Sequence, residues 1–388
     1  MNILMVHPHD LFDKSEPWTI RIKSIAEKFV ERGHKVKICY FPLTINEKNL
    51  PRNLNSILLI PLDRTPSPLA FIVNAFKLIS ICKWADIVHF QKCHHYSAVP
   101  VVLASYITCK PLHYEWDDWE EKIWFESCGR GLNSRFIGFS FRVLERWLPV
   151  LADSVSCASD QLKRLSNKFG VAKDYIFDAP VGGDLDKFRP GLDGEWVKRK
   201  FNIEGELILY IGQLHGAQYV DLLLKAVNIV HHKHPSATFM IVGEGFLERS
   251  LRNLARELGI EDKVIFAGAV SHDEIPYFIA AADVCVASFK DTEVTRCKSP
   301  LKIVEYLASG KPIVASNVGE IRKMVGGVGI LVEPGDFHSL AKGILRFLDD
   351  EVLRTTLGSR ARKRAETKYN WIYTAESLLS AYEKILKP

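Results

Sequence analysis

The chain has 388 residues, 47% of them hydrophobic and 25% charged, and its formal net charge is +5. This length is enough for two domains of ordinary size, and the composition is that of a globular protein that dissolves in water. The excess of positive charge is too small for a nucleic-acid-binding domain, so no nucleic-acid partner is expected. The eight cysteines form no CxxC pair, and the chain begins directly with an apolar strand, which predicts a reduced protein of the cytoplasm.

Short apolar runs alternate with amphipathic segments through the first half, which predicts a series of βα units around a parallel sheet. The first strand is expected at Ile3–Val6, followed by a loop over 7–17 and a helix that Gly33 ends. The later strands of this half are expected at Val36–Tyr40, Ile87–Phe90, Leu112–Trp116 and Ser154–Ala158.

Two segments of this half are interpreted as helices with different surroundings. Leu69–Cys82, which Asn74 and Lys77 interrupt, is too short to span a bilayer and is expected to be a helix of the core. The segment 130–147 suits peripheral contact with an anionic membrane surface, and the alternative is a helix that covers its own sheet with its arginines in solvent. Its apolar face carries Phe136, Phe139, Val143 and Trp147, and another face carries Arg135, Arg142 and Arg146.

A second βα series fills the other half of the chain. Its strands are expected at Leu207–Ile211, Thr238–Val242, Lys263–Ala267, Val284–Ala287, Pro312–Ser316 and Ile330–Val332. Its helices are expected at 219–233, 247–258, 274–281, 338–348, 351–368 and 371–386. Glycines and prolines gather between Gly182 and Gly194, which places a domain boundary there and predicts one domain over 1–186 and another over 187–370.

One further helix of this half carries charged residues where a ligand is expected. It follows the strand Val284–Ala287, with Ser299 as its predicted N-cap and Pro300 at its first position. Lys302 and Glu305 fall on the side opposite its apolar face. In an open parallel sheet, a helix N-terminus at a strand end suits a phosphate. The alternative is a surface helix with a solvated lysine–glutamate pair.

From Leu207 onward the chain resembles the retaining glycosyltransferases of family 4. The resemblance is carried by LILYIGQLHGAQYVDLLLKAV, PSATFMIVGEG, DKVIFAGAVSHDEIPYFIAAADVCVAS and SPLKIVEYLASGKPIVAS, and more loosely before them by ERGHKVKI, ADIVHF, KPLHYEWDD, LADSVSCAS and GGDLDKFRP. It implies the α/β GT-B architecture, in which two Rossmann-like doubly wound domains face an interdomain cleft. The acceptor then binds to 1–186 and the nucleotide sugar to 187–370, and the last helix, 371–388, packs back on the first domain.

The resemblance assigns residues to the donor, and this chain departs from the family at three of them. Glu305 matches the second of two family glutamates, which bonds the ribose hydroxyls, whereas the first falls at Cys297 and is missing. The family's arginine and lysine for the diphosphate fall at Gln213 and Gln218, so both cations are missing. Because a departing diphosphate carries negative charge, other cations are needed.

Residues beside the helix N-terminus are expected to supply that charge. These donor-site candidates are Arg296, Lys298, Ser299 and Lys302. Gly212 and Gly243 are expected to let the backbone approach the ligand closely. The alternative is that the basic residues are solvated and that catalysis is weakened or altered.

The segment KPLHYEWDDWEE resembles a family segment that ends in a histidine and an aspartate facing the reacting sugar. Asp117 falls on the histidine position and Asp118 on the aspartate position, so both are candidate catalytic residues. A carboxylate there can orient the acceptor hydroxyl or take its proton. The alternative is a strand-end turn with two solvated acids. The acceptor side is expected to include Trp18, Thr19 and Arg21.

These observations predict a retaining, metal-independent glycosyltransferase of the hexosyltransferase type. It would use a nucleotide-diphosphate sugar as co-substrate, with UDP favoured over GDP, and no cofactor. A hydroxyl of a glycan or a lipid-linked acceptor would receive the sugar in cell-surface polysaccharide or glycolipid synthesis, in the cytoplasm or at the inner face of the membrane. The alternatives are a nucleotide-binding scaffold of the same fold with little or no transfer activity and a sugar-nucleotide epimerase.

Overall fold

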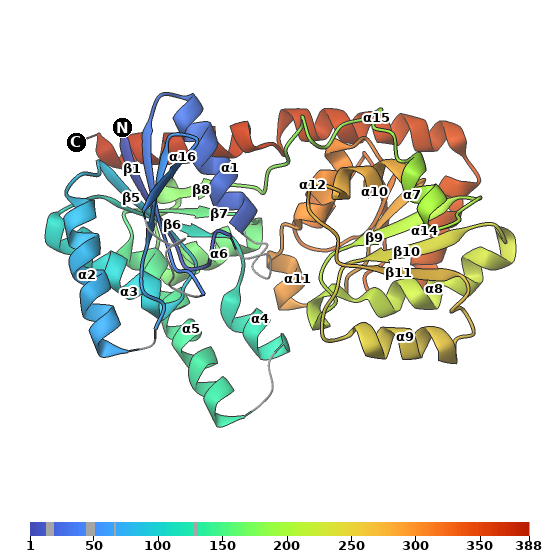
Figure 1. Cartoon of the computed structure of the whole chain (residues 1–388), viewed down its shortest axis with the longest axis horizontal. Helices are drawn as coiled ribbons and strands as arrows, with labels where there is room; N and C mark the ends of the chain where they lie inside the picture. Colours follow the sequence, from blue (N-terminus) through green and yellow to red (C-terminus); the bar gives the residue numbers. More distant parts are fainter. Residues whose placement is uncertain (13–18, 44–50, 66, 128–130, 388) are drawn as a thin grey trace. The chain divides into compact units, whose positions relative to one another are not determined.

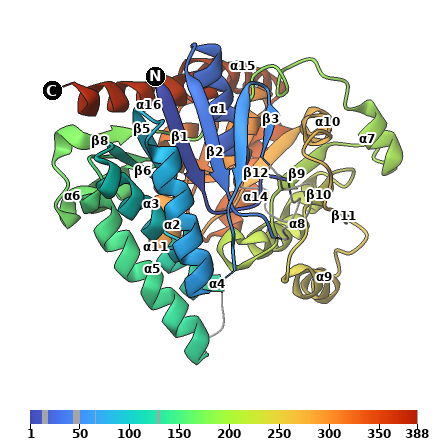
Figure 2. The same ribbon diagram turned by 60° about the vertical axis from the view of Figure 1, so that its left-hand side comes forward.

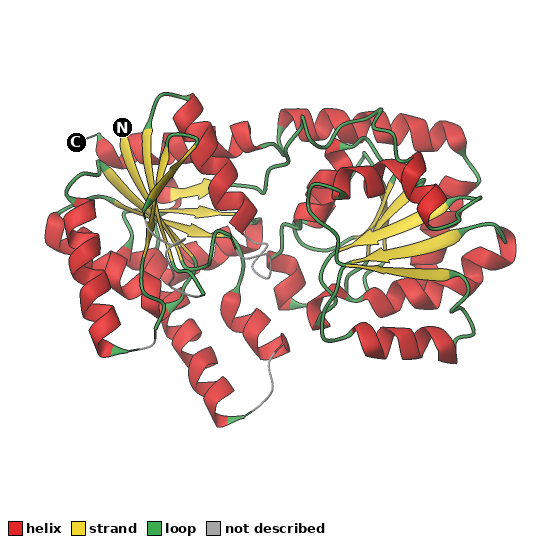
Figure 3. Ribbon diagram, viewed as in Figure 1, coloured by secondary structure: helices red, strands yellow, loops and turns green. Residues whose placement is uncertain are grey.

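The computed structural model describes residues 1–12, 19–43, 51–65, 67–127 and 131–387. Contacts divide the chain into two compact units, Met1–Pro180 with Trp371–Pro388, and Val181–Asn370. Each unit consists of a sheet flanked by helices (Figures 1 and 3), which confirms the predicted pair of doubly wound α/β domains. The boundary predicted after residue 186 lies a few residues beyond the one that the contacts define.

The first unit is built on an eight-stranded sheet in the order β3-β4-β2-β1-β5-β6-β7-β8, in which only β3 runs antiparallel to its neighbour. The sequence does not predict β3, β4 or β8. Two of them are the edge strands of the sheet, and edge strands lack the continuous apolar run of a buried strand. The strands are β1 (Asn2–His7), β2 (Lys35–Tyr40), β3 (Arg52–Leu54), β4 (Ile57–Pro61), β5 (Ile87–Gln91), β6 (Leu112–Trp116), β7 (Ser154–Cys157) and β8 (Ile176–Asp178).

The helices of the first unit form two layers, one on each face of the sheet (Figures 1 and 2). They are α1 (Ile20–Glu31), α2 (Pro68–Cys82), α3 (His95–Thr108), α4 (Glu120–Ser127), α5 (Leu132–Leu151), α6 (Asp160–Phe169) and α16 (Trp371–Leu386). One layer contains α1 and α16, which contact each other, so the last helix belongs to the first unit. The other contains α2, α3 and α5. Among the helices of the described residues, none has the length and hydropathy needed to cross a membrane.

The prediction that Leu69–Cys82 is a core helix is wrong for one of its faces. The helix forms as α2, but only Ala70, Asn74, Leu78 and Cys82 are buried. Leu69, Ile72, Val73 and Phe76 are exposed, although all four are apolar. Apolar composition alone cannot separate a helix buried on all sides from one that leaves an apolar stripe uncovered, and the tertiary structure decides this point.

A buried polar network joins α1 and α16 to the sheet of the first unit. The Nε and Nη2 atoms of Arg21 donate to Glu115 Oε1 at 3.0 and 2.6 Å. Glu115 Oε2 bonds to His89 Nε2 at 3.2 Å, and His89 Nδ1 bonds to the Tyr382 hydroxyl on α16 at 2.6 Å. Burial would raise the pKa of Glu115, but Arg21 and His89 outweigh it and hold that pKa well below its usual value.

The second unit contains a six-stranded parallel sheet in the order β11-β10-β9-β12-β13-β14. Its strands are β9 (Leu207–Ile211), β10 (Thr238–Val242), β11 (Val264–Gly268), β12 (Val284–Ala287), β13 (Ile313–Ser316) and β14 (Ile330–Val332). All six lie within one residue of the predicted bounds. The agreement follows from burial on both faces, because such strands carry continuous apolar runs that are visible in the sequence.

The helices of this unit are α7 (Glu195–Lys200), α8 (Val220–Lys233), α9 (Glu248–Glu257), α10 (Ile275–Ala281), α11 (Glu293–Cys297), α12 (Leu301–Ala308), α13 (Ile321–Val325), α14 (Phe337–Leu348) and α15 (Glu351–Thr367). The segment predicted as a polar loop before α12 contains the short helix α11, which Thr292 and Thr295 cap reciprocally. The N-cap of α12 is Pro300 rather than the predicted Ser299.

Lys302 and Glu305 on α12 are buried, so the alternative of a solvated pair does not hold. The reason is that other parts of the unit cover this side of the helix: Lys302 contacts Tyr210 and Gln218, and Glu305 contacts His272.

Both sheets reverse their strand order at one point, which lies between β1 and β5 in the first unit and between β9 and β12 in the second. In open α/β sheets, ligands bind outside the carboxyl ends of the strands at such a point. The residues to consider in each unit are therefore those that follow β1 and β5, and those that follow β9 and β12.

We expect Arg21→Met to lower the free energy of unfolding of the first unit by about 3–5 kcal/mol, because it leaves Glu115 buried without its cation. The stability that the pair contributes is present above the ordinary carboxyl pKa and is lost as pH falls through the lowered pKa of Glu115, so the loss in the variant should shrink in acid. Urea unfolding followed by circular dichroism at several pH values measures this.

Arg32→Met is the matched control. Arg32 also joins α1 to α16, through an ion pair with Glu376. The side chains of Arg32 and Glu376 are both half exposed. Its loss should therefore cost at most about 1 kcal/mol. Equal costs in the two variants would contradict the structural role given to Arg21.

Candidate functional site

In the second unit, the buried ammonium of Lys302 lies beside the loop that follows β9. Lys302 Nζ donates to the Tyr210 hydroxyl at 2.8 Å and to Gln218 Oε1 at 3.0 Å. Gln218 is the position at which the sequence lacks an expected cation. The structure thus brings the amine of α12 to that position, and both oxygens that accept its hydrogen bonds are uncharged.

The electrostatic surroundings of this ammonium favour an anionic ligand. Burial, together with the charge of Lys298, lowers the pKa of Lys302 well below its usual value, although Glu305 opposes the shift. Burial and the charges of Lys298 and Lys302 also lower the pKa of His215 to about 4. Two amines and an imidazole therefore act on one another here, and an anion bound among them would relieve their repulsion.

Two glycines let parts of the protein pack closely at this point. Gly212 follows β9 with a φ of 142°, and a Cβ atom there would lie 2.5 Å from Lys302 Nζ. Gly243 follows β10 with a φ of 135°, and a Cβ atom there would lie 2.1 Å from the carbonyl oxygen of Gly212. Any side chain at either position would be strained and would collide with a neighbour, so glycine is required at both.

Glu305 is held by a residue that the sequence analysis does not single out. Its Oε1 atom bonds to His272 Nε2 at 2.8 Å, and His272 Nδ1 lies 3.0 Å from the Nζ atom of Lys187. The histidine comes from the turn between β11 and α10. It fixes one oxygen of the carboxylate and so orients the other. A histidine in a polar turn has no sequence signal that separates it from a solvated one.

The remaining donor-site candidates divide into two groups. Lys298 is buried, Ser299 is partly exposed, and the buried Oγ atom of Ser299 has no hydrogen-bond partner among the described residues. A buried hydroxyl without a partner is costly in a native structure and is consistent with a ligand that completes it. Arg296 and Gln213 are exposed, and Arg296 binds Asp291 through Nε and Nη2 at 2.6 and 2.9 Å. The structure thus groups Lys298 with Lys302 and leaves Arg296 in a separate surface pair.

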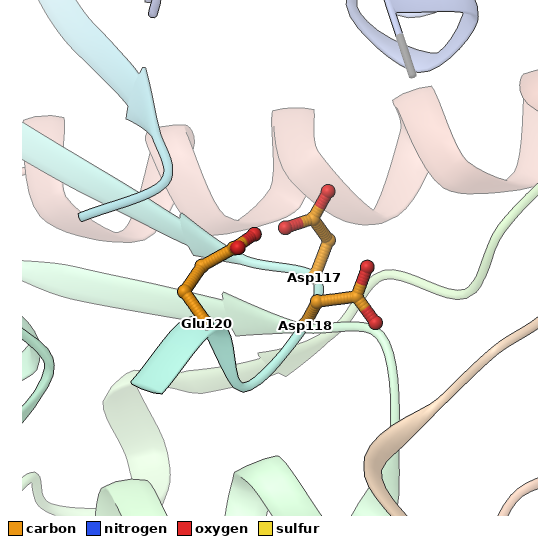
Figure 4. A group of neighbouring side chains, drawn as sticks. All are labelled: Asp117, Asp118 and Glu120. Atoms are coloured by element: carbon orange, nitrogen blue, oxygen red, sulfur yellow. The ribbon is translucent and has the colours of Figure 1, made fainter. Parts of the chain in front are cut away.

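In the first unit, Lys92 forms ion pairs with the two candidate catalytic aspartates. Its Nζ atom lies 3.1 Å from Asp117 Oδ1, 3.8 Å from Asp118 Oδ2 and 2.6 Å from Glu120 Oε1. Figure 4 shows these three carboxyl groups between the end of β6 and the start of α4. The aspartates are thus part of a charged cluster, so they are not simply two solvated acids of a strand-end turn.

The conformation and charge of Lys92 set it apart from a surface lysine. It is buried and has a φ of 65°, a left-handed conformation that costs energy for a residue with a side chain. Burial would lower the pKa of Lys92, but Asp117, Glu120 and Asp118 outweigh it and raise that pKa well above its usual value. The sequence does not indicate this residue, because nothing along the chain shows that the end of β5 meets the end of β6.

The carboxyl groups of this cluster are close enough to hold a metal ion, since their ligand atoms lie within 4.8 Å of one another. The ammonium of Lys92 already supplies a positive charge to them. His7, at the end of β1, borders the same cluster: its pKa is lowered well below the usual value, chiefly by burial and His9, while Asp117 opposes the shift. His7 Nδ1 bonds to Gln91 Oε1 at 2.8 Å, and among the described residues its buried Nε2 atom has no partner.

The residues expected on the acceptor side are placed differently. Thr19 and Arg21 are buried, and the guanidinium of Arg21 bonds to Glu115 and to the carbonyl oxygens of Ala179 and Pro180. Arg21 thus belongs to the network that joins α16 to the sheet. Trp18 lies outside the described residues.

Comparisons with known proteins agree with this geometry. Residues 195–364 match the family model described as glycosyl transferases group 1. The chain is 26% identical over 235 residues to mannosylfructose-phosphate synthase of Agrobacterium fabrum, a match that covers 58% of this chain and 51% of that protein. It is 28% identical over 221 residues to the GDP-mannose-dependent alpha-(1-6)-phosphatidylinositol monomannoside mannosyltransferase of Mycobacterium tuberculosis, which covers 55% of this chain and 57% of that protein.

The chain therefore spans about half the length of the curated relatives it matches. Among solved structures, HepE of Anabaena in complex with UDP and glucose matches with a TM-score of 0.77 and 20% identity over 99% of both chains. At this identity the likeness concerns the fold, which is the GT-B fold. The match to glycosyl transferases group 1 lies within the second unit.

We expect Lys302→Met to weaken the binding of UDP by about 10–100-fold, because a hydrogen bond to a charged group contributes about 1.5–3 kcal/mol. Isothermal titration calorimetry measures this. Lys311→Met is the matched control: Lys311 is a lysine of the same unit that donates to the carbonyl oxygens of Ala280 and Ala282, away from the cluster. Equal affinity of the Lys302 variant and the wild type would remove Lys302 from the site.

The lowered pKa values predict that UDP binding takes up protons. A bound diphosphate stabilises the charged form of Lys302 and of His215, so it raises both pKa values toward their usual range. The affinity should therefore fall as the pH rises through the lowered pKa of Lys302. Calorimetry in buffers of different ionisation enthalpy measures the uptake, which should be smaller in Lys302→Met. Proton release on binding would contradict this assignment.

Proposed function

We propose that this protein is a glycosyltransferase that moves a sugar from a nucleotide-diphosphate donor to a hydroxyl group of an acceptor. The observation that carries the proposal is the group of buried cations formed by Lys298 and Lys302 beside the N-terminus of α12, with the buried Ser299 hydroxyl, which has no hydrogen-bond partner among the described residues. The match of residues 195–364 to glycosyl transferases group 1 supports the same activity.

In the proposed reaction the bond between the anomeric carbon and the diphosphate oxygen breaks, and the electron pair leaves with the nucleotide diphosphate. Lys302 and Lys298 stabilise the charge that develops on this leaving group, and the N–H groups at the start of α12 assist them. Glu305, oriented by His272, binds the ribose hydroxyls. The cations thus replace those missing at Gln213 and Gln218. UDP is the favoured nucleotide, which the presence of UDP in the HepE structure supports.

On the first unit, Asp117 and Asp118 act on the acceptor. A new bond forms between the acceptor oxygen and the anomeric carbon, and the hydroxyl proton passes to Asp117 or to the departing phosphate. Lys92 positions Asp117, since its Nζ atom lies 3.1 Å from the Oδ1 atom of Asp117. A carboxylate at this place also stabilises positive charge on the anomeric carbon.

Further features of the proposal rest on the motifs shared with family 4. The enzyme retains the anomeric configuration of the donor sugar and needs neither metal nor cofactor, since amines and a helix N-terminus neutralise the diphosphate. The acceptor is a glycan or a lipid-linked glycan used in cell-surface polysaccharide or glycolipid synthesis. A lipid-linked acceptor agrees with peripheral contact of the segment 130–147 with the inner face of the membrane, and the phosphatidylinositol acceptor in the name of the mycobacterial relative supports it.

The deciding experiment incubates the protein with labelled sugar nucleotides and an extract of glycan and glycolipid acceptors, and identifies the products by mass spectrometry. Transfer of the label to an acceptor is expected. Tight nucleotide binding without any transfer would favour a scaffold of the same fold, and turnover of the sugar nucleotide to an isomer with no acceptor present would favour an epimerase. The anomeric configuration of the product, read by NMR, tests retention.

The variants Asp117→Asn and Glu305→Ala should distinguish the role of Asp117 in turnover from the role of Glu305 in nucleotide binding. We expect Asp117→Asn to leave the affinity for UDP unchanged and to lower turnover by about 100-fold or more, the usual contribution of a group that transfers a proton. Glu305→Ala should weaken UDP binding, because the ribose loses a charged partner. Wild-type turnover in Asp117→Asn would exclude the role given to this residue, and wild-type affinity in Glu305→Ala would exclude that of Glu305.

A further inference from the structure

Three helices of the first unit expose apolar side chains on one layer of the fold. Helix α2 contacts α3, and α3 contacts α5, so the three lie side by side on the same face of the sheet (Figure 2). On each helix the exposed apolar residues follow helical spacing and therefore form a stripe. The stripes contain Leu69, Ile72, Val73 and Phe76 on α2, Leu103, Tyr106 and Ile107 on α3, and Phe136, Phe139, Val143, Trp147, Val150 and Leu151 on α5.

The degree of exposure is unusual for side chains of this size. Leu69 and Phe76 are 71% and 70% exposed, Tyr106 is 83% exposed, and Phe136 is 76% exposed. Scattered apolar residues on a protein surface need no explanation, but contiguous apolar patches usually mark a surface that binds a partner or a membrane. The three stripes belong to helices of one layer, in which α3 contacts both α2 and α5.

The charges of the same helices identify the partner. Neither α2 nor α3 contains an aspartate or a glutamate, and the single acidic residue of α5, Glu145, is buried. The exposed charges on α2 and α5 are all positive, namely Lys77, Arg135, Arg142 and Arg146. A surface that combines exposed aromatic and aliphatic side chains with cations and excludes exposed carboxylates is complementary to the headgroups and acyl chains of an anionic bilayer.

A cavity at the border of this face gives room for a headgroup. It has a volume of about 300 Å³ and is lined by Lys122, Arg142 and Arg146 among others. Two carboxyl groups also line it, but each has partners: Glu121 accepts from Arg142 Nε at 2.7 Å, and Glu145 accepts from the main-chain N–H groups of Glu120 and Glu121.

We propose that α2, α3 and α5 together form a face that docks this protein on the surface of an anionic lipid bilayer. The inference deepens the membrane contact of the segment 130–147 in the proposed function and rests on it, but it assigns the contact to three helices instead of one. Phe76 and its neighbours on α2 insert among the acyl chains, and the arginines of α5 face the phosphates of the headgroups. Helices in this arrangement lie on the bilayer and do not cross it.

Sedimentation of the full-length protein with lipid vesicles tests the proposal. We expect it to bind vesicles that contain phosphatidylglycerol, to bind vesicles of phosphatidylcholine alone much more weakly, and to dissociate as the salt concentration rises. Phe76→Ser should weaken binding by about tenfold, because one large apolar side chain no longer inserts. Its matched control is Phe246→Ser, since Phe246 is 66% exposed but belongs to the second unit.

The arginines are tested in the same way. Arg135→Gln and Arg146→Gln should each weaken binding by about fivefold, since a cation near an anionic surface contributes about that factor. Their control, Arg249→Gln, removes an exposed arginine of the second unit and should have no effect.

Several outcomes would overturn the proposal. One is an absence of binding to the anionic vesicles, and another is equal binding of Phe76→Ser and Phe246→Ser. A dimer in light scattering that Phe76→Ser dissociates would assign the face to a second copy of this chain. Vesicle binding needs no sugar nucleotide, and transfer to a soluble acceptor needs no vesicle, so failure of the docking face is distinguishable from failure of the proposed activity.

Discussion

The charged cluster of the second unit depends on one buried ammonium, that of Lys302. An amine taken out of water among uncharged oxygens is unfavourable in its charged form, and the charge of Lys298 makes it more so. A dianionic or trianionic ligand reverses this balance, because it supplies the opposite charge where water is excluded. The Ser299 hydroxyl, which has no partner among the described residues, lies just before the helix that carries Lys302. The site is thus formed in advance around a ligand's charge.

The charged clusters of the two units have opposite net charge, and both lie near the point where the strand order of the sheet reverses. In the first unit Lys92 follows β5, a strand at the reversal, and its carboxyl partners follow the adjacent strand β6. In the second unit the lysines follow β12, which lies at the reversal with β9. In the first unit three carboxyl groups surround one lysine, whereas in the second unit the lysines have one glutamate near them, and a histidine holds it. The first arrangement suits a neutral hydroxyl acceptor that must lose a proton, and the second suits a phosphate that must leave with negative charge.

The helices on the two faces of the first unit's sheet also differ in how they contact the strands and in what they expose. On one face, Arg21, Glu115, His89 and Tyr382 tie α1 and α16 to the strands through buried polar contacts. On the other face, α2, α3 and α5 bury one side and leave apolar side chains uncovered. The two layers therefore differ in what they show to the outside and in how they are held to the strands.

The sequence by itself determined the architecture of the second unit, because its strands are buried on both faces and appear as continuous apolar runs between helices of regular period. It also singled out Asp117, Lys302 and Glu305 as charged residues that follow strand ends or open a helix. It did not find β3, β8, Lys92 or His272, since short edge strands and single polar residues in turns have no pattern along the chain.

The tertiary structure decided which of these residues meet. Whether Lys302 faces water or Gln218, whether Arg296 joins Lys298 or Asp291, and whether the apolar stripe of α2 is covered all depend on elements distant in the chain. Periodicity fixes the direction of a side chain relative to its own helix, but only the packing of other elements against that helix fixes what the side chain touches.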